Sequence, residues 1–252
     1  MAAESFDTQE NGKSGHTRQQ PRRATKRSHA IFEELQKDIM LGHLPPRAAI
    51  LELQLADRFE CSQSTIREAL MFLQTDGLVE RLPHRGTFVA DSRGEDAREL
   101  ILIRHDIECR GVIRVLNHFG PLLRKELEAD LDAMRQAAKE GDEYRLSLHD
   151  RNFHLNLYNA ADMPSVSPIL RRCLIHNHRY KILNSEPNRG LVETAERHVA
   201  ILDALAAGDE KHAVEALSRH ITTIVDFGPS ILAVDADTGP EKLVPTKSGS
   251  AK

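Results

Sequence analysis

The segment from residue 28 to residue 92 restricts the fold more than any other part of the chain. Three stretches have the spacing of apolar residues that is typical of helices, and two short alternating stretches follow them. We expect helices at Ser28–Gly42, Leu51–Phe59 and Ser62 to about Asp76, and strands at Leu78–Leu82 and Thr87–Ala90. Three helices followed by a hairpin is the order of a winged helix-turn-helix.

The third of these helices begins with more polar side chains than a cap requires. Ser62 can cap the helix, and Gln63, Ser64, Thr65 and Arg67 follow it in the first turns. The other face is apolar and can pack on the rest of the domain; it consists of Ile66, Ala69, Leu70 and Leu73. A recognition helix has this arrangement, because its N-terminal residues contact base edges and phosphates in the major groove. The alternative, a capped surface helix without a ligand, leaves the spare polar groups unexplained.

The motif LADRFECSQSTIREALMFLQTDGLVERLPHRGTFV resembles the N-terminal domain of the GntR family of bacterial transcription regulators. The resemblance covers about residues 28–92 and implies DNA contacts from the start of the third helix and from the tip of the wing. The residues concerned are Ser62, Gln63, Ser64, Thr65, Arg67, Arg85 and Gly86. The family usually has arginine where this chain has Gln63. Arginine favours guanine, whereas glutamine can bridge adenine N6 and N7, so the base preference at this position stays open.

The chain changes character after residue 92. No strand pattern is found, and six amphipathic stretches follow one another: 96–118, 120–140, 143–160, 164–184, 189–207 and 210–231. We expect an all-helical bundle of six or seven helices in a second domain at residues 96–234. The fold class is therefore mainly α, with an N-terminal winged helix-turn-helix and a C-terminal all-helical bundle.

Both ends of the chain have little apolar content, and we expect residues 1–27 and 235–252 to be disordered. The N-terminal tail is basic. Between residues 13 and 27 it has no acid and six cations, which are Lys13, Arg18, Arg22, Arg23, Lys26 and Arg27. The net charge of the whole chain is −4, so a DNA-binding surface has to be local to the N-terminal part.

One carboxylate and three histidines of the second domain have the spacing of a metal site. Asp150 and His154 are four residues apart and share one helix face. His198 and His220 lie on the two arms of a helical hairpin that turns at Gly208, at similar heights above the turn. Such a set suits Zn²⁺ or Ni²⁺ with a coordination position left open. Eight histidines lack a defensible spacing partner and are set aside: His29, His43, His84, His105, His118, His176, His178 and His212.

The same residues carry a second resemblance. HDRNFH, ERHVAILDALAAGDEKHAVEAL and SRHI resemble the FCD ligand-binding domain of the FadR-type branch of the GntR family. The resemblance implies that Asp150, His154, His198 and His220 bind a divalent metal. It also implies that Arg104 contacts the effector, which would be a small organic acid, because an arginine and an open metal position both favour a carboxylate.

The sequence predicts a DNA-binding transcription regulator, in particular a cytoplasmic repressor that binds a pseudo-palindromic operator as a homodimer. No apolar run is long enough to cross a membrane, and no secretory signal is found. Two alternatives stay open. One is a regulator of the same family whose metal is structural or absent and whose effector differs, and the other is a metal-dependent enzyme.

Overall fold

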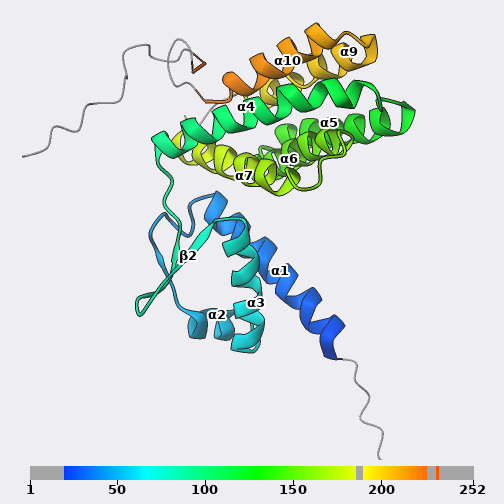
Figure 1. Cartoon of the computed structure of the whole chain (residues 1–252). Coiled ribbons are helices and arrows are strands. Elements are labelled where there is room, and N and C mark those ends of the chain that lie inside the picture. Colours follow the sequence, from blue (N-terminus) through cyan, green and yellow to red (C-terminus); the bar gives the residue numbers. More distant parts are fainter. Residues whose placement is uncertain (1–19, 186–189, 226–230, 233–252) are drawn as a thin grey trace, which may run out of the picture.

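The computed structural model describes residues 20–185, 190–225 and 231–232 (Figure 1). Figure 1 shows two parts, a small domain that contains the sheet and a larger bundle of helices beside it. The predicted fold class is confirmed. The predicted C-terminal tail, residues 235–252, and residues 1–19 of the predicted N-terminal tail lie outside the described residues.

The smaller domain has the order of a winged helix-turn-helix. Its elements are α1 (Gln20–Met40), β1 (Ala49–Ile50), α2 (Glu52–Arg58), α3 (Gln63–Thr75), β2 (Val79–Leu82) and β3 (Gly86–Val89). The three strands form an antiparallel sheet in the order β1-β3-β2, with Val79 opposite Val89 and Leu82 opposite Gly86. The apolar faces of α1 and α3 meet in one core, in which Leu35, Ile66 and Leu73 are fully buried.

Two boundaries in this domain differ from those expected. The first helix begins at Gln20 and not at Ser28, which is buried within it. Arg27 donates hydrogen bonds to the carbonyl oxygens of Phe59 and Glu60 and so ties the early part of α1 to the end of α2. The second difference is β1, which lies in a segment without a strand pattern. It has only two residues, and it forms because β3 offers them a free edge.

The larger part is a bundle of helices, and in the described residues it has seven. They are α4 (Gly94–Leu116), α5 (Pro121–Glu140), α6 (Glu143–Asn159), α7 (Ser167–Asn184), α8 (Leu191–Glu196), α9 (Val199–Ala207) and α10 (Glu210–Thr222). The predicted single helix at 189–207 is therefore two helices, which meet at a turn at Arg197 and His198. The predicted last helix ends at Thr222 and not at residue 231.

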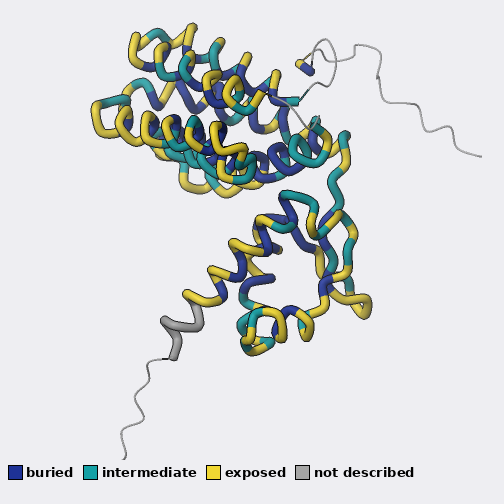
Figure 2. The backbone as a smooth tube through the Cα atoms, turned by 180° about the vertical axis from the view of Figure 1, so that it is seen from behind, coloured by how far each residue is buried: buried dark blue, intermediate teal, exposed yellow. Residues whose placement is uncertain are grey.

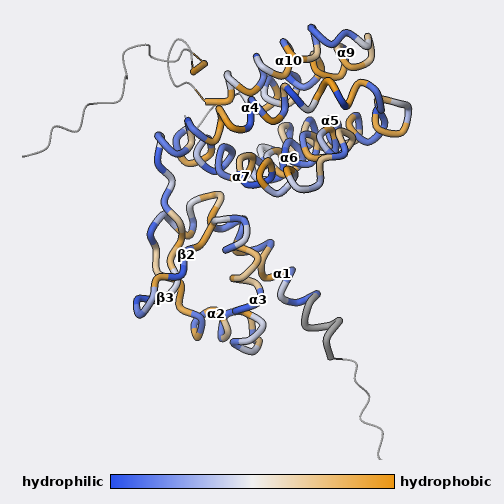
Figure 3. The backbone as a smooth tube through the Cα atoms, viewed as in Figure 1, coloured by the Kyte–Doolittle hydropathy of each residue, from blue (hydrophilic) through white to orange (hydrophobic). Residues whose placement is uncertain are grey.

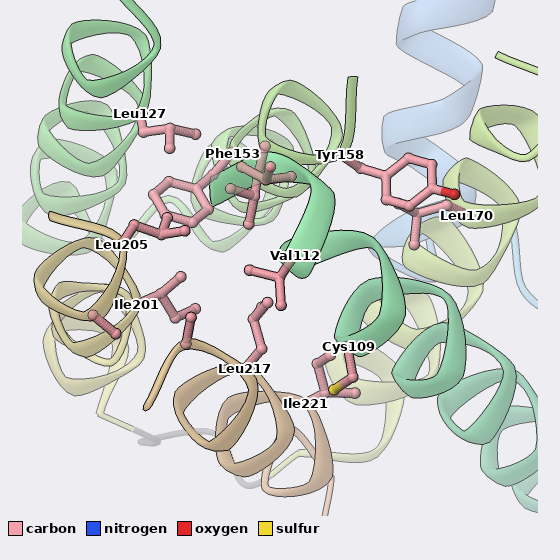
Figure 4. Packing of buried hydrophobic residues seen from close by; sticks show 14 of the residues in the cluster. Cys109, Val112, Leu127, Phe153, Tyr158, Leu170, Ile201, Leu205, Leu217 and Ile221 are labelled. Atoms are coloured by element: carbon pink, nitrogen blue, oxygen red, sulfur yellow. The ribbon is translucent and has the colours of Figure 1, made fainter. Parts of the chain in front are cut away.

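The bundle is held together by one large apolar core. Figure 4 shows Leu127, Phe153, Ile201 and Leu217 pointing into the space between their helices. Figure 2 shows that the buried positions lie on the inner sides of the helices, and Figure 3 shows each helix alternating between hydrophobic and hydrophilic segments. This is the pattern of helices that each bury one face. Among the described residues, no helix is long and apolar enough to span a membrane.

Candidate DNA-binding surface and metal site

The start of α3 exposes a row of hydrogen-bonding side chains. Ser62 is the N-cap residue, and its hydroxyl accepts a hydrogen bond from the backbone N–H of Thr65 at 3.3 Å. The same hydroxyl lies 2.8 Å from Oγ of Ser64 and 2.9 Å from Oγ1 of Thr65. Ser64 is exposed, and Gln63 is half-buried. Figure 1 places α2 at the end of this domain remote from the bundle, so the turn between α2 and α3 is open to a ligand as large as DNA.

Arg67 lies one turn further along α3 and is held before any DNA binds. Its Nε donates to Oε2 of Glu52 on α2 at 2.7 Å, and its Nη2 donates to Oε1 of Gln63 at 3.3 Å. The side chain is more than half exposed, so the pair with Glu52 contributes little to stability. Its effect is to hold the guanidinium beside Gln63, where the two side chains can read neighbouring groups in one groove.

The tip of the wing exposes a second cation of this domain. Arg85 and Gly86 are both exposed at the turn between β2 and β3. Gly86 has a φ of +102°, a conformation that L-residues with side chains rarely adopt, and no atom lies within 4 Å of where a Cβ would be. The glycine is therefore required by the turn itself, and the open space around it leaves room for close approach of a sugar-phosphate backbone.

The four residues with metal-ligand spacing meet inside the bundle. Asp150 and His154 come from α6, His198 precedes α9, and His220 lies in the last turn of α10. One ligand atom from each lies within 4.8 Å of the others, and all four residues are buried. The hairpin brings the rings of His198 and His220 to 4.4 Å between centroids.

The spacing of the ligand atoms fits one small divalent cation. Nε2 of His154 lies 3.0 Å from Nε2 of His220 and 3.7 Å from Oδ1 of Asp150. Nε2 of His198 lies 3.5 Å from Oδ2 of Asp150. Adjacent ligands of a cation with bonds of about 2.0–2.2 Å lie roughly 2.8–3.1 Å apart in octahedral and 3.3–3.6 Å apart in tetrahedral geometry, and beside four protein ligands only the octahedral geometry leaves positions open. The donor set of one carboxylate and three imidazoles is one that Zn²⁺ and Ni²⁺ accept.

Hydrogen bonds on the far side of two rings leave the inner nitrogens free to bind a metal. Nδ1 of His154 lies 2.6 Å from Oε2 of Glu108, and Nδ1 of His198 lies 3.1 Å from the carbonyl oxygen of Ala195. Both oxygens are acceptors, so each Nδ1 carries the proton and each Nε2 keeps its lone pair. Nε2 of His198 is buried without a hydrogen-bond partner. A metal ion bound among the four residues would meet this unpaired nitrogen.

The protonation states of the cluster also suit a divalent metal ion. Burial lowers the pKa of His198 to about 4 and holds the pKa of His220 well below its usual range. Burial opposes ionisation of Asp150, but the imidazoles of His178 and His198 outweigh it, and its pKa lies well below the usual value. At neutral pH the cluster therefore has an ionised carboxylate and neutral rings at His198 and His220, which is the state that binds metal.

Arg104 lies beside this cluster and is fully buried. Its Nε donates to Oε1 of Glu108, whose other oxygen holds His154. Burial raises the pKa of Glu108, but Arg104 and His154 outweigh it and bring it to about 2. Nη1 and Nη2 of Arg104 are buried and have no hydrogen-bond partner. A guanidinium with two unmet nitrogens is the group that a carboxylate ligand would pair with.

The space that reaches the cluster opens between α9 and α10. A groove of about 600 Å³ has apolar walls from Ala200, Ala204 and Ala216, and it is bounded on its inner side by His220. Arg104 does not line this groove. The structure thus places the expected effector arginine at the cluster, but not on the wall of the open groove.

Sequence spacing missed one histidine of this site. His178 comes from α7 and is 3% exposed, and its Nε2 lies 3.0 Å from Oδ1 of Asp150. The contact depends on how α7 packs against α6, and no i, i+4 spacing in the sequence predicts it. An apolar neighbourhood for a histidine, with Ile175 and Leu174 close before it in the chain, was the only signal that the sequence offered.

A winged helix-turn-helix joined to a separate helical domain is the architecture of a class of DNA-binding transcription regulators. Residues 27–89 match the family described as bacterial regulatory proteins, gntR family, and residues 99–223 match the FCD domain. The chain therefore belongs to the GntR family of transcription regulators, in the branch that has an FCD domain.

Individual relatives agree with this assignment. The HTH-type transcriptional regulator BphR of Paraburkholderia xenovorans is 28% identical over 215 residues, which cover 78% of this chain and 82% of BphR. A probable D-xylose utilization operon transcriptional repressor of Paenarthrobacter nicotinovorans is 29% identical over 184 residues, which cover 73% of this chain and 80% of the repressor. The structure of McbR/YncC of E. coli has the same fold, with a TM-score of 0.66 at 22% identity, and the match covers 78% of this chain and 94% of that one. The family and these relatives are transcription regulators and not enzymes.

Proposed function

We propose that this regulator is a homodimeric repressor whose affinity for a two-fold operator is set by a small carboxylate metabolite. The metabolite binds at a divalent metal, Zn²⁺ or Ni²⁺, held by Asp150, His154, His198 and His220. The observation that carries the proposal is the convergence of these four buried ligand atoms within 4.8 Å, with two histidine tautomers fixed from outside. When bound, the metal supplies a Lewis-acidic position for a carboxylate oxygen.

The chain's own residues have distinct tasks in this proposal. Seven of them contact DNA: Ser62, Gln63, Ser64, Thr65, Arg67, Arg85 and Gly86. Glu108 orients the ring of His154, and Arg104 offers two unpaired nitrogens to the acid. The bundle core surrounds the cluster, in which all four ligand residues are buried, and the groove between α9 and α10 is the approach for the acid.

The metal site is tested by replacing one ligand, with a histidine of the same bundle as a control. His198→Ala removes a fully buried ligand, so purified protein should lose its equivalent of Zn²⁺ or Ni²⁺ and its response to the effector. His118→Ala changes an exposed histidine beyond the end of α4, away from the groove between α9 and α10, and it should retain both. Elemental analysis gives the metal content. A full equivalent of metal and a normal response in His198→Ala would mean that the site is wrong.

The class of effector is tested separately with metal-loaded protein. A panel of small mono- and dicarboxylates is added, and the melting temperature is followed, because a ligand that binds only the folded form stabilises it by RT ln(1 + [L]/Kd). We expect at least one acid to raise the melting temperature, and Arg104→Lys, which keeps the charge but not the paired nitrogens, to weaken that rise. A ligand that is uncharged, or an equal rise in Arg104→Lys, would contradict the role of Arg104.

A further inference from the structure

Helix α7 belongs to the cores of both domains. Leu170 and Leu174 are fully buried in the core of the bundle. Ile175 is also fully buried, but it belongs to the apolar core of the winged helix-turn-helix. Figure 1 shows α7 on the side of the bundle that faces the smaller domain. Residues Arg171, Ile175 and Arg179 are spaced by four and so form one stripe of α7 directed at that domain.

The first polar contact of this stripe holds the end of the recognition helix. Asp76 is the C-cap residue of α3. Arg171 donates from Nε to Oδ1 of Asp76 at 3.0 Å and from Nη2 to Oδ2 at 3.1 Å, and Nε2 of His176 lies 3.0 Å from the carbonyl oxygen of Asp76. A bidentate arginine–carboxylate pair fixes direction as well as distance. Consequently α3 cannot shift along α7 without breaking these contacts.

The second contact holds the base of the wing. Arg179 is fully buried and donates to the carbonyl oxygens of Ala90 at 2.8 Å and Asp91 at 3.1 Å, where β3 leads into the linker to α4. Burial lowers the pKa of Arg179 to about 10, so the guanidinium still carries its charge at neutral pH. A buried cation met by two backbone oxygens is costly to displace, because both carbonyls would lose their partner.

The residue next to Arg179 points the other way, into the metal cluster. His178 places Nε2 3.0 Å from Oδ1 of Asp150, and the Nδ1 of His178 is buried without a partner. On the side of the other ligands, Oδ1 of Asp150 also lies 3.7 Å from Nε2 of His154, and Oδ2 lies 3.5 Å from Nε2 of His198. A cation among these ligands attracts the carboxylate to which His178 is also attracted. Asp150 therefore has two competing partners. A shift of its carboxylate towards the metal changes the contact that His178 of α7 makes with it.

We propose that His178 couples occupancy of the metal cluster to operator binding, by transmitting the position of Asp150 through α7 to α3 and the wing. The inference rests on the proposed metal site and names the route by which that site controls DNA binding. Because coupling between two binding sites is reciprocal, metal must change operator affinity by the same factor by which operator changes metal affinity.

The experiment measures this factor in the full chain from both directions. The operator probe is a duplex selected from random DNA with the wild-type protein, and the metal is Zn²⁺. Operator affinity is measured with Zn²⁺ and after chelation, and Zn²⁺ affinity is measured by competition with a chromophoric chelator, with and without the duplex. In the wild type we expect the two ratios to agree at about 5- to 150-fold, the usual size of such couplings.

Two variants of one position separate coupling from binding. His178→Leu should still bind Zn²⁺ and the duplex, but both ratios should fall to within about twofold of one, which is below the usual range of couplings. His178→Gln places an amide N–H near the position of Nε2 and should restore most of the factor. His118→Leu, an exposed histidine beyond the end of α4, makes the same chemical change away from α7 and should behave as the wild type.

The outcomes distinguish this inference from the proposed function. A wild-type protein that binds no Zn²⁺ refutes the metal site and the inference with it. A protein that binds Zn²⁺ but shows no coupling, or equal coupling in wild type and His178→Leu, overturns the inference alone. If His178→Leu does not fold, Arg171→Met replaces it, since this side chain is 45% exposed and pairs with Asp76 of the smaller domain. Unchanged coupling in Arg171→Met would equally overturn the route through α7.

Discussion

At the scale of single residues, Glu108 shows how a side chain outside the set of four metal ligands can control the metal site. It accepts from Nδ1 of His154 through one oxygen and from Nε of Arg104 through the other. Glu108→Gln keeps the shape but removes the charge that fixes the tautomer of His154. We expect Zn²⁺ affinity to fall by about 10- to 100-fold, the usual cost of losing a partner behind a metal ligand.

The control for this prediction lies on the same helix. Asp106→Asn makes the same chemical change at an exposed carboxylate of α4 that pairs with Arg110, and metal affinity should not change. Competition with a chromophoric chelator measures both variants. Equal Zn²⁺ affinity in Glu108→Gln and wild type would mean that His154 is not held in this way.

Gln63 is the residue at which the DNA-reading surface departs from the usual pattern of its family. Its Oε1 accepts from Nη2 of Arg67, so the two side chains act as a pair at the start of α3. Gln63→Arg should shift the selected operator towards guanine in each half-site, because arginine pairs with O6 and N7 of guanine. Selection from random duplexes with both proteins makes the comparison. An identical consensus for the two proteins would show that residue 63 does not face the bases.

The sequence predicted which four residues could form the cluster, but not what surrounds them. Asp150 and His154 follow from the helical repeat, and His198 and His220 follow from similar distances to the turn at Gly208. His178 could not be found in this way, because its contact with Asp150 depends on the packing of two helices. The unmet nitrogens of Arg104 are a property of the folded interior and leave no trace in the order of residues.

At the scale of elements, the close crossing of α4 and α6 depends on Gly111. A Cβ at this position would lie 2.6 Å from Cε2 of Tyr158, whose ring is 2% exposed and packed in the core. Gly111→Ala gains helix propensity of about 0.5–1 kcal/mol, but overpacking costs about 1–3 kcal/mol. We therefore expect a net loss of stability and a melting temperature lower by a few degrees.

A second substitution tests the cause of this loss. In a Tyr158→Leu background the shorter side chain removes the clash, so the added Gly111→Ala change should no longer destabilise the bundle. The double-mutant cycle is measured by thermal or urea unfolding. Additive losses in the cycle would mean that contact with Tyr158 is not the reason.

The elements whose boundaries differ from expectation have one cause in common. Tertiary contacts, and not the local sequence, determine where these helices begin and end. The stretch 189–207 has no glycine or proline after Gly190, so its helical pattern reads as unbroken, yet the chain turns at His198 to aim the ring at the cluster. The helix α1 extends back to Gln20, where composition alone favours a loose tail. In contrast, α3 and the wing agree with expectation, because capping and turn residues fix them locally.

At the scale of the whole molecule, one winged domain presents one recognition helix and one wing, so two copies are needed to read a two-fold site. We expect the protein to be a dimer and the selected operator to be an inverted repeat, with half-sites whose centres are about one helical turn (~10 base pairs) or a multiple of it apart. Sedimentation equilibrium gives the oligomeric state, and a spacing series tests the geometry. Adding about 5 base pairs between half-sites turns them to opposite faces of the duplex and should abolish tight binding, whereas adding ~10 should restore part of it. A monomer in solution, full affinity for an isolated half-site, or equal affinity for two half-sites at every spacing would contradict the dimeric mode of reading.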